Sequence, residues 1–213
     1  MGAAACALVP APPGKPSALR RLREIEAGIP PKADLILFGD SLAAGWPPEL
    51  YGRAFPNRRV FNFGLPGDRV QTSAWRLENL SVGHLRPREL LVLLGTNNLG
   101  DGDPPDAVAA ALAALVGRAA ALWGEPATIV ATIPRRGELP GFREADRGVL
   151  NATLARALSR VPRARILDSD MALAAGPGEA PSLLADHLHL SEAGYGRLSA
   201  ALAALLGPAG DGP

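Results

Sequence analysis

Five short apolar segments alternate along this chain with longer amphipathic ones, and this alternation constrains the fold more than any other feature. Several of the short segments are apolar at nearly every position, which is typical of strands buried on both faces of a parallel sheet. Strands that alternate with helices in this way predict a doubly wound α/β domain. The five segments are residues 34–39, 60–64, 90–95, 128–133 and 165–168.

The amphipathic segments between and after these strands carry helix signals. One helix is predicted to follow an N-cap at Asp103 and two prolines, with apolar residues at helical spacing as far as Leu122. Residues 149–161 repeat this spacing. A last helix is expected to begin after Ser191 as its N-cap and to stop at Gly207.

The length of 213 residues suits one domain, and we find no internal repeat. Residues 1–16 are rich in Ala, Pro and Gly, and we expect them to form a flexible N-terminal segment. Residues 208–213 have a similar composition and are expected to be a flexible tail. A single domain is therefore predicted over residues 17–207.

Charge and cysteine content exclude several classes of function. Twenty-two Lys and Arg residues oppose 21 Asp and Glu residues, so the net charge of +1 favours neither a nucleic-acid partner nor an anionic membrane surface. Cys6 is the only cysteine, which rules out an intrachain disulfide. Because the N-terminus lacks a basic signal-peptide region and no run reaches the ~20 apolar residues of a membrane span, we expect a cytoplasmic protein.

Residues that could take part in chemistry follow the apolar segments where ligands of such sheets bind, beyond the carboxyl ends of the strands. We therefore expect the loops that carry them to meet at one edge of the sheet. These residues are Asp40 and Ser41, Gly64, Asn97, Arg135 and Arg136, and, in a loop after the fifth segment, Asp186 and His189.

Ser41 is predicted to lie where a strand turns sharply into a helix. Its backbone N–H is unpaired there and the positive end of the helix dipole is close, so an oxyanion would be favoured beside it. A serine after a strand more commonly only caps a helix. Asp40 is adjacent in sequence, and we expect its side chain to point elsewhere and brace the loop.

A serine nucleophile needs a base, and the base needs a carboxylate to orient it. The three-residue spacing of Asp186 and His189 lets the carboxylate fold back onto Nδ1, leaving Nε2 free to face Ser41. His187 is too close to Asp186 for that geometry and is expected to be a loop residue, whereas His84 precedes the third strand and lies at the wrong end of the sheet. Two histidines could ligate zinc, but no third ligand stands at a recognisable spacing.

Two residues could donate hydrogen bonds to the oxyanion of a tetrahedral intermediate. The amide of Gly64 is accessible because glycine has no side chain, and the side-chain amide of Asn97 is a donor. As alternatives, Gly64 is a turn residue and Asn97 a loop cap.

Together these segments resemble the SGNH/GDSL hydrolase superfamily over residues 33–206. Within it they most resemble the catalytic subunits of platelet-activating factor acetylhydrolase Ib and their bacterial relatives. The blocks that carry the resemblance occur in the family's order: Phe38-Gly39-Asp40-Ser41-Leu42, Asn62-Phe63-Gly64 followed by Gly67-Asp68, Gly95-Thr96-Asn97-Asn98, and Asp186-His187-Leu188-His189.

The resemblance implies a flavodoxin-like three-layer α/β/α sandwich with a five-stranded parallel sheet. It implies a serine esterase for short-acyl, above all acetyl, esters, with Ser41 as nucleophile, His189 as base and Asp186 as orienting acid. The oxyanion hole would comprise the N–H groups of Ser41 and Gly64 and the Asn97 side chain. No metal or organic cofactor is expected. The resemblance also implies a homodimer.

Departures from the family leave the substrate open. Leu65, Asn98, Arg135 and Arg136 stand where this chain differs, and we expect them to border the substrate pocket. Alternative functions are a carbohydrate O-deacetylase, a lysophospholipase or a thioesterase. A non-catalytic, flavodoxin-like subunit is a further alternative, although residues 43–47 offer little to cradle a phosphate.

Overall fold

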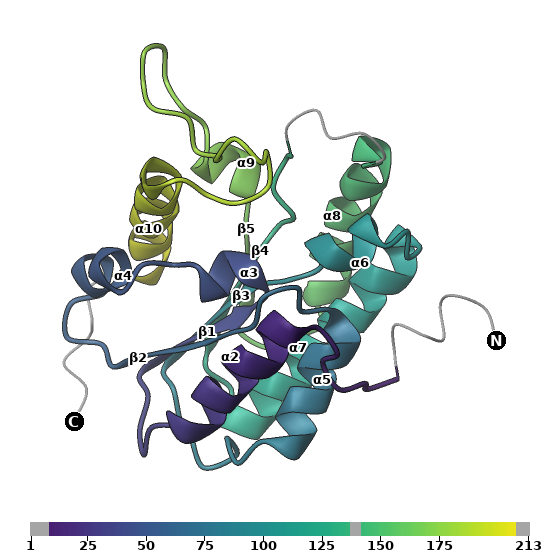
Figure 1. Ribbon diagram of the computed structural model, residues 1–213, viewed down its shortest axis with the longest axis vertical. Helices are drawn as coiled ribbons and strands as arrows, with labels where there is room; N and C mark the ends of the chain where they lie inside the picture. The colour runs from purple at the N-terminus through teal and green to yellow at the C-terminus, as the bar shows by residue number, and fades with distance from the viewer. Residues whose placement is uncertain (1–8, 137–141, 208–213) are drawn as a thin grey trace.

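The computed structural model describes residues 9–136 and 142–207. Within them, five parallel strands form one sheet in the order β2-β1-β3-β4-β5 (Figure 1). Each strand falls on one of the apolar segments singled out in the sequence. The strands are β1 (Leu35–Gly39), β2 (Val60–Gly64), β3 (Glu89–Leu93), β4 (Ala127–Ala131) and β5 (Ala164–Leu167).

The sheet is covered by helices on both faces, which confirms the expected three-layer sandwich (Figure 1). Strand β1 lies at the centre between β2 and β3, and all five of its residues are buried. The helices are α2 (Pro16–Ala27), α3 (Ser41–Ala44), α4 (Pro48–Ala54), α5 (Val70–Asn79), α6 (Thr96–Gly100), α7 (Pro105–Trp123), α8 (Glu144–Leu158), α9 (Ser169–Ala172) and α10 (Glu192–Leu206).

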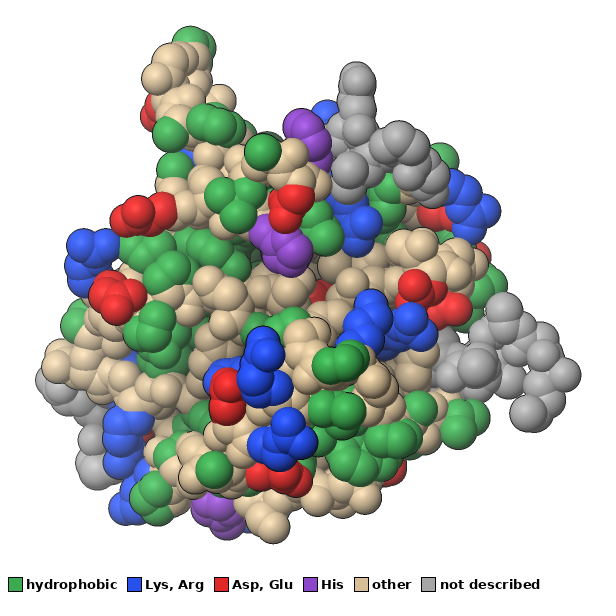
Figure 2. Space-filling model, in the orientation of Figure 1, with side chains coloured by type: hydrophobic (Ala, Val, Ile, Leu, Met, Phe, Trp, Pro, Cys, Tyr) green, Lys and Arg blue, Asp and Glu red, His purple; other side chains and the backbone are tan. Residues whose placement is uncertain are grey.

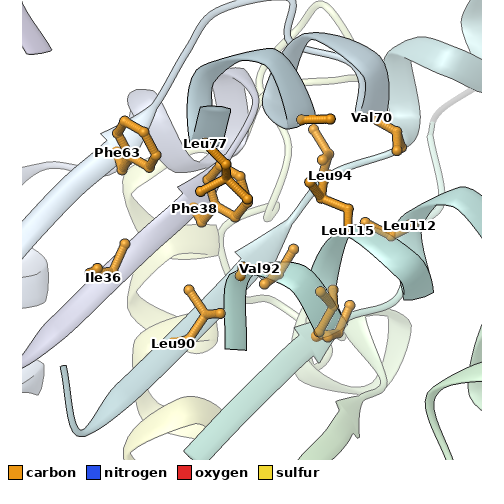
Figure 3. Close-up of a cluster of buried hydrophobic side chains, with 14 of the residues drawn as sticks. Ile36, Phe38, Phe63, Val70, Leu77, Leu90, Val92, Leu94, Leu112 and Leu115 are labelled. Atoms are coloured by element: carbon orange, nitrogen blue, oxygen red, sulfur yellow. The ribbon is translucent and has the colours of Figure 1, made fainter. Parts of the chain in front are cut away.

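Successive strand residues point to opposite faces, so two hydrophobic cores form. On one face Ile36, Phe38, Leu90 and Val92 pack beneath α2, α5, α7 and α8 (Figure 3). On the other face Leu35, Leu37, Leu91 and Leu93 pack beneath α3 and α10, with α4 and α9 at the periphery. Because both faces are covered, the strands lack the polar alternation of a half-exposed sheet.

The predicted long helices are present, but α7 and α8 differ from the prediction in their bounds. Helix α8 begins at Glu144, before the predicted residues 149–161, and ends at Leu158. Helix α10 has Ser191 as its N-cap, whose hydroxyl accepts from the Gly194 N–H, and it ends before Gly207. Helix α7 begins one residue later than expected and has Pro104 as N-cap with no side-chain bond. Asp103 does not cap α7; its Oδ2 accepts instead from the side-chain amide of Asn98 at 2.8 Å.

Helix α7 is long and apolar enough, by length and composition, to cross a membrane. In this structure 56% of its most apolar stretch is buried inside the domain, where it packs against the sheet and α8. The composition of α7 therefore fits its position as a core helix.

The N-terminal residues that the structure describes lie against the domain. The amide of Ala11 donates to the carbonyl of Gln71 at 3.2 Å, Pro13 is buried, and α2 starts at Pro16. The first eight residues of the predicted N-terminal segment and the whole predicted tail, 208–213, lie outside the described residues. The domain limits of 17 and 207 stay a prediction.

Candidate active site

Ser41 is the first residue of α3, directly beyond the carboxyl end of the central strand. A Cβ at Gly39 would lie 1.9 Å from the Leu93 carbonyl oxygen, so only glycine lets β1 approach β3 at this point. Asp40 is the N-cap of α3, and its Oδ1 accepts from the Leu42 N–H at 2.9 Å. Within the described residues, the N–H of Ser41 has no acceptor, so it is available for a ligand.

Ser41, His189 and Asp186 form a continuous hydrogen-bonded series across the edge of the sheet. Nε2 of His189 lies 3.0 Å from Oγ of Ser41, and Nδ1 lies 2.6 Å from Oδ2 of Asp186. The side chains of His189 and Asp186 remain 39% and 48% exposed, so solvent and substrate can reach the base. Figure 2 shows a His and an acidic side chain meeting near the middle of this face, above a hollow.

Asp186 is held by its own chain segment as well as by the imidazole. Its Oδ1 accepts from the backbone amides of Leu188 and His189 at 3.0 and 2.9 Å. The hydrogen bond from His189, reinforced by these two amides, lowers the pKa of Asp186 to about 2. The carboxylate is therefore ionised at neutral pH and fixes the imidazole with Nδ1 as donor.

The other two histidines lie away from Ser41. His187 is exposed and has φ +56°, in a turn where its amide donates to the Leu184 carbonyl. Nε2 of His84 lies 3.0 Å from the Pro30 carbonyl oxygen, before β3 and so at the opposite end of the sheet. Of the three histidines, only His189 reaches the serine.

Asn97 lies on α6, beside the end of β3, and its side chain is partly exposed. Its Nδ2 donates to the carbonyl of Asp68 at 2.9 Å. A side-chain amide carries two N–H donors, and this bond uses one of them. The second N–H can serve an oxyanion.

Gly64 does not have the geometry that the sequence predicted for an oxyanion donor. Its amide donates to Oδ1 of Asn62 at 3.0 Å, and Asn62 also donates from Nδ2 to the Ala43 carbonyl at 2.8 Å. A Cβ at Gly64 would lie 2.2 Å from the Ala44 nitrogen. Gly64 is glycine because β2 must pass close beneath α3, and its N–H is already bonded.

Gly67, three residues later, has the features that Gly64 lacks. It lies in a tight turn that is closed by the Asp68 N–H donating to the Leu65 carbonyl at 3.1 Å, and its φ is +72°. Within the described residues its own N–H has no acceptor, and the adjacent Asp68 carbonyl binds Asn97. The Gly67-Asp68 pair was visible in the sequence, but nothing there distinguished its amide from that of Gly64.

A buried ion pair, which sequence reasoning did not identify, supports this turn. Arg76 of α5 bonds Asp68, and both side chains are fully buried. The guanidinium donates from Nη1 to the Phe63 carbonyl at 2.7 Å and stacks 4.4 Å from the centre of the Phe63 ring. Ser73 also donates to Asp68, at 2.6 Å. The turn at 65–68 is thus tied to both β2 and α5.

Two residues predicted to border the substrate pocket are buried instead. Leu65 is fully buried in the core. Asn98 is also fully buried: its Oδ1 accepts from the Val70 N–H at 3.1 Å, and its Nδ2 donates to Gln71 and Asp103. Neither side chain presents surface to a ligand, because α6 turns Asn97 outward and Asn98 inward.

Arg135 and Arg136 line an open groove beside the site, together with Met171, Leu173 and Leu183. The Arg135 side chain is 73% exposed and lies 3.8 Å from Glu144. Arg136 is half-buried. Its guanidinium donates hydrogen bonds to the hydroxyl and the carbonyl of Thr96.

A parallel α/β sandwich with Ser, His and Asp hydrogen-bonded in series at its carboxyl edge has the geometry of the serine hydrolases. The chain belongs to the GDSL-like lipase/acylhydrolase family, whose sequence model matches residues 37–197. It is therefore a carboxylic ester hydrolase, and the resemblance seen in the sequence is confirmed.

Named relatives agree with this family. The chain is 33% identical over 176 residues to the alpha1 subunit of platelet-activating factor acetylhydrolase IB from Rattus norvegicus, a match that covers 81% of this chain and 75% of the relative. The alpha2 subunit from Bos taurus is 26% identical over 167 residues, covering 78% and 72%.

Solved structures share the fold at lower identity. A lipase/acylhydrolase from Enterococcus faecalis aligns with a TM-score of 0.65 at 23% identity, covering 82% of this chain and 94% of that one. A carbohydrate acetylesterase from Sinorhizobium meliloti aligns with a TM-score of 0.64 at 18% identity, covering 81% and 97%.

Proposed function

We propose that this chain hydrolyses short-acyl esters, above all acetyl esters, through an acyl-enzyme on Ser41. The observation that carries the proposal is the series of hydrogen bonds from Ser41 to His189 at 3.0 Å and from His189 to Asp186 at 2.6 Å. A serine hydroxyl is a weak nucleophile until a base lies within hydrogen-bond reach, and here the base is itself oriented by an ionised carboxylate.

In the first half of the reaction, Oγ of Ser41 attacks the ester carbonyl while Nε2 of His189 takes the hydroxyl proton. Asp186 stabilises the imidazolium that forms. The tetrahedral intermediate then collapses, the alkoxide leaves with the proton from His189, and the acyl group stays on Ser41. In the second half, water attacks this ester with His189 as base, which releases the acid and restores Ser41.

The negative oxygen of each tetrahedral intermediate needs preorganised donors. We assign three: the N–H of Ser41, the second N–H of the Asn97 side chain, and the N–H of Gly67. Gly67 replaces the predicted Gly64, because the Gly64 amide is bonded to Asn62 whereas the Gly67 amide is not bonded within the described residues. The Asn97 bond to the Asp68 carbonyl places the side-chain donor beside the Gly67 turn.

The names of similar proteins support a short acyl group. Relatives of this chain are named acetylhydrolases, and one structure with the same fold is named a carbohydrate acetylesterase.

A fluorophosphonate probe tests the nucleophile. We expect the wild-type protein to be labelled at Ser41, and Ser41→Ala to lose both labelling and ester hydrolysis. Labelling of an intact Ser41→Ala protein, or a wild type that neither labels nor hydrolyses any ester, would overturn the proposal. The second result would favour the non-catalytic subunit.

A series of p-nitrophenyl esters from acetate to octanoate, run beside acetylated sugars, tests the substrate class. We expect kcat/KM to be highest for acetate and to fall with each added pair of carbons. Faster hydrolysis of acetylated sugars would identify a carbohydrate O-deacetylase, whereas a preference for octanoate would point to a lysophospholipase or thioesterase and contradict the short-acyl assignment.

A further inference from the structure

We infer that Arg136 is a positioning residue that fixes Asn97 by clamping Thr96, its neighbour on α6. This inference rests on the proposed function, since it assigns Arg136 a role through an oxyanion donor. The expectation that Arg136 borders the substrate pocket stays a prediction, because Arg136 also lines the groove beside the site.

Helix α6 cannot hold its own orientation. It has five residues, which is too short for a stable helix without tertiary contacts. Its N-cap is Gly95, with φ +118°, so no side chain bonds its first amides. The position of Asn97 therefore depends on the tertiary contacts of its two neighbours, Thr96 and Asn98.

Asn98, on one side of Asn97, is held by α5 and by Asp103 in the loop that precedes α7. Its side chain bonds the Val70 amide, Gln71 and Asp103. Thr96, on the other side, is buried and is held by Arg136. Asn97 thus lies between two neighbours that are anchored to different parts of the sandwich.

The Arg136 contact with Thr96 uses a fork of donors. Nη2 donates to the Thr96 carbonyl at 2.9 Å and to its hydroxyl at 2.5 Å, and Nε lies 3.1 Å from the same hydroxyl. A planar guanidinium that binds two acceptors of one residue fixes both its distance and its rotation. The guanidinium also lies 4.3 Å from the centre of the Phe142 ring, so one of its faces is covered.

The backbone that delivers Arg136 is itself anchored. After β4, Ile133 donates its N–H to Asn151 at 2.9 Å, and its carbonyl accepts from Asn151 and from the buried Arg147. The Arg135 amide donates to Asp170 at 2.8 Å. Because the loop is fixed on both α8 and α9, the guanidinium can transmit that fixed position to Thr96.

A double-mutant cycle on a neutral ester, p-nitrophenyl acetate, tests the inference. Arg136→Met should lower kcat by about 10- to 100-fold, because a displacement of a positioned group by ~1 Å can cost up to ~10² in rate. KM should change less than about twofold, because a neutral substrate offers the guanidinium no charge. In an Asn97→Ala background the same substitution should lower kcat less than about twofold further.

Arg143→Met is the matched control, because it removes an exposed guanidinium that pairs with Asp146 before α8 and leaves the Thr96 contact intact. Its kcat should stay within about twofold of wild type. Arg136→Lys keeps the charge but not the fork, and we expect it to recover only part of the lost kcat. If Arg136→Met does not fold, the cycle is run with Arg136→Lys, for which the same non-additivity is expected.

Losses that multiply in the Asn97→Ala background would overturn the inference, because Arg136 would then act independently of Asn97. A change in KM alone would also overturn it, since it would indicate direct contact with the substrate. These outcomes are distinct from failure of the proposed function, which would appear as residual activity in Ser41→Ala with Arg136 unchanged.

Discussion

Asp186 accepts three hydrogen bonds although its side chain is about half exposed. A carboxylate bonded in this way stays ionised, and its pKa of about 2 lies well below the pH range of any neutral esterase assay. Since the pKa is depressed in the folded state, protonation of Asp186 disfavours the native site only as the pH falls towards 2. Between pH 4 and 8, the charge of Asp186 is constant.

Asp186→Asn removes that charge while preserving the size of the side chain. We expect kcat to fall by about 10⁴, because the amide no longer favours the imidazole tautomer with Nε2 free to accept the Ser41 proton. The decisive measurement is kcat on p-nitrophenyl acetate across pH 5 to 8. A loss below about tenfold throughout this range would mean that Asp186 does not orient the base.

The two histidines of the Asp186–His189 segment provide an internal comparison. His189→Ala should lower kcat by at least about 10³, because the serine then lacks its base. His187→Asn should keep kcat within a few-fold, because His187 is exposed and Asn adopts the left-handed conformation that position 187 requires. The opposite pattern of activities would show that His187 is the base.

Asp40 titrates in a different range. Burial raises its pKa to about 7, helped by the charge of Asp68 and opposed by the hydrogen bond from Leu42 and by Arg136. The folded state therefore holds this proton more tightly than the unfolded chain. The resulting stability is fully present below the unfolded pKa of 3.8 and is lost as the pH rises through about 7.

Asp40→Asn keeps an acceptor for the Leu42 N–H but has no proton to lose. The free energy of unfolding of the wild type should therefore fall between pH 4 and 7 by up to about 4 kcal/mol more than that of the variant. Urea unfolding at pH 4, 5.5 and 7 measures this difference. Parallel curves for the two proteins would show that Asp40 is ionised throughout.

At single residues, the sequence predicted which residues could react better than it predicted the direction in which an amide or a side chain points. Ser41, His189 and Asp186 follow from residue type and spacing, because a three-residue turn brings a carboxylate onto an imidazole. The Gly64 amide and the Asn98 side chain are bonded within the protein, which the sequence did not predict, because the direction of a backbone amide or a short side chain depends on its neighbours in space. Asn62 binds the Gly64 amide, and Val70 with Asp103 binds Asn98.

Among the elements, the strands, the helices α7, α8 and α10 and the start of α3 after β1 were predicted from the sequence, whereas the other helices were not. Strand β1 is apolar at every buried position, and α10 carries its own cap signals at Ser191 and Gly207. Helices α6 and α9 have five and four residues, respectively, and such segments form only because tertiary contacts hold them. Their positions were therefore not visible in local sequence, although Asn97 of the site lies on one of them.

The Asp68–Arg76 pair joins three elements, and its removal should be costly. Arg76→Met leaves the Asp68 carboxylate buried without its guanidinium, so we expect a loss of about 3–5 kcal/mol in the free energy of unfolding. Asp68→Asn/Arg76→Met should lose less than Arg76→Met, since it leaves no buried charge unpaired. Urea unfolding of both proteins measures this. A double variant no more stable than the single one would assign the loss to packing on Phe63 instead.

At the scale of the whole molecule, the two faces of the sheet carry the hydrophobic cores and its carboxyl edge carries the site residues. Two cores on opposite sides of the sheet hold the strands in place, and the carboxyl edge carries Ser41, Asn97 and the loop of His189. On the face shown in Figure 2, positive and negative side chains are interspersed rather than gathered into one patch of a single sign. The homodimer that the resemblance implies stays a prediction.

The N-terminal residues 9–15 lie against the Gly67 turn of the proposed site. Ala11 bonds the backbone of Gln71, just beyond the Gly67 turn, and a Cβ at Gly67 would lie 3.5 Å from the Lys15 side chain. Residues 11–15 form one wall of a cavity whose other wall is the turn at 65–68 together with the start of α5. They therefore cover the back of a turn to which we assign an oxyanion donor.

Two truncated proteins test whether this segment belongs to the domain or is the flexible extension that composition predicts. Removing residues 1–8 should leave both stability and kcat unchanged, because every contact of residues 9–15 is retained. Removing residues 1–15 eliminates the Ala11 bond and the burial of Pro13, so we expect a loss of about 1–2 kcal/mol in the free energy of unfolding. A several-fold decrease in kcat should accompany it, because the Gly67 turn loses one of its supports, whereas KM for p-nitrophenyl acetate should hold. If the two truncated proteins behave alike, residues 9–15 only rest on the surface, and the domain begins at α2 as the composition predicts.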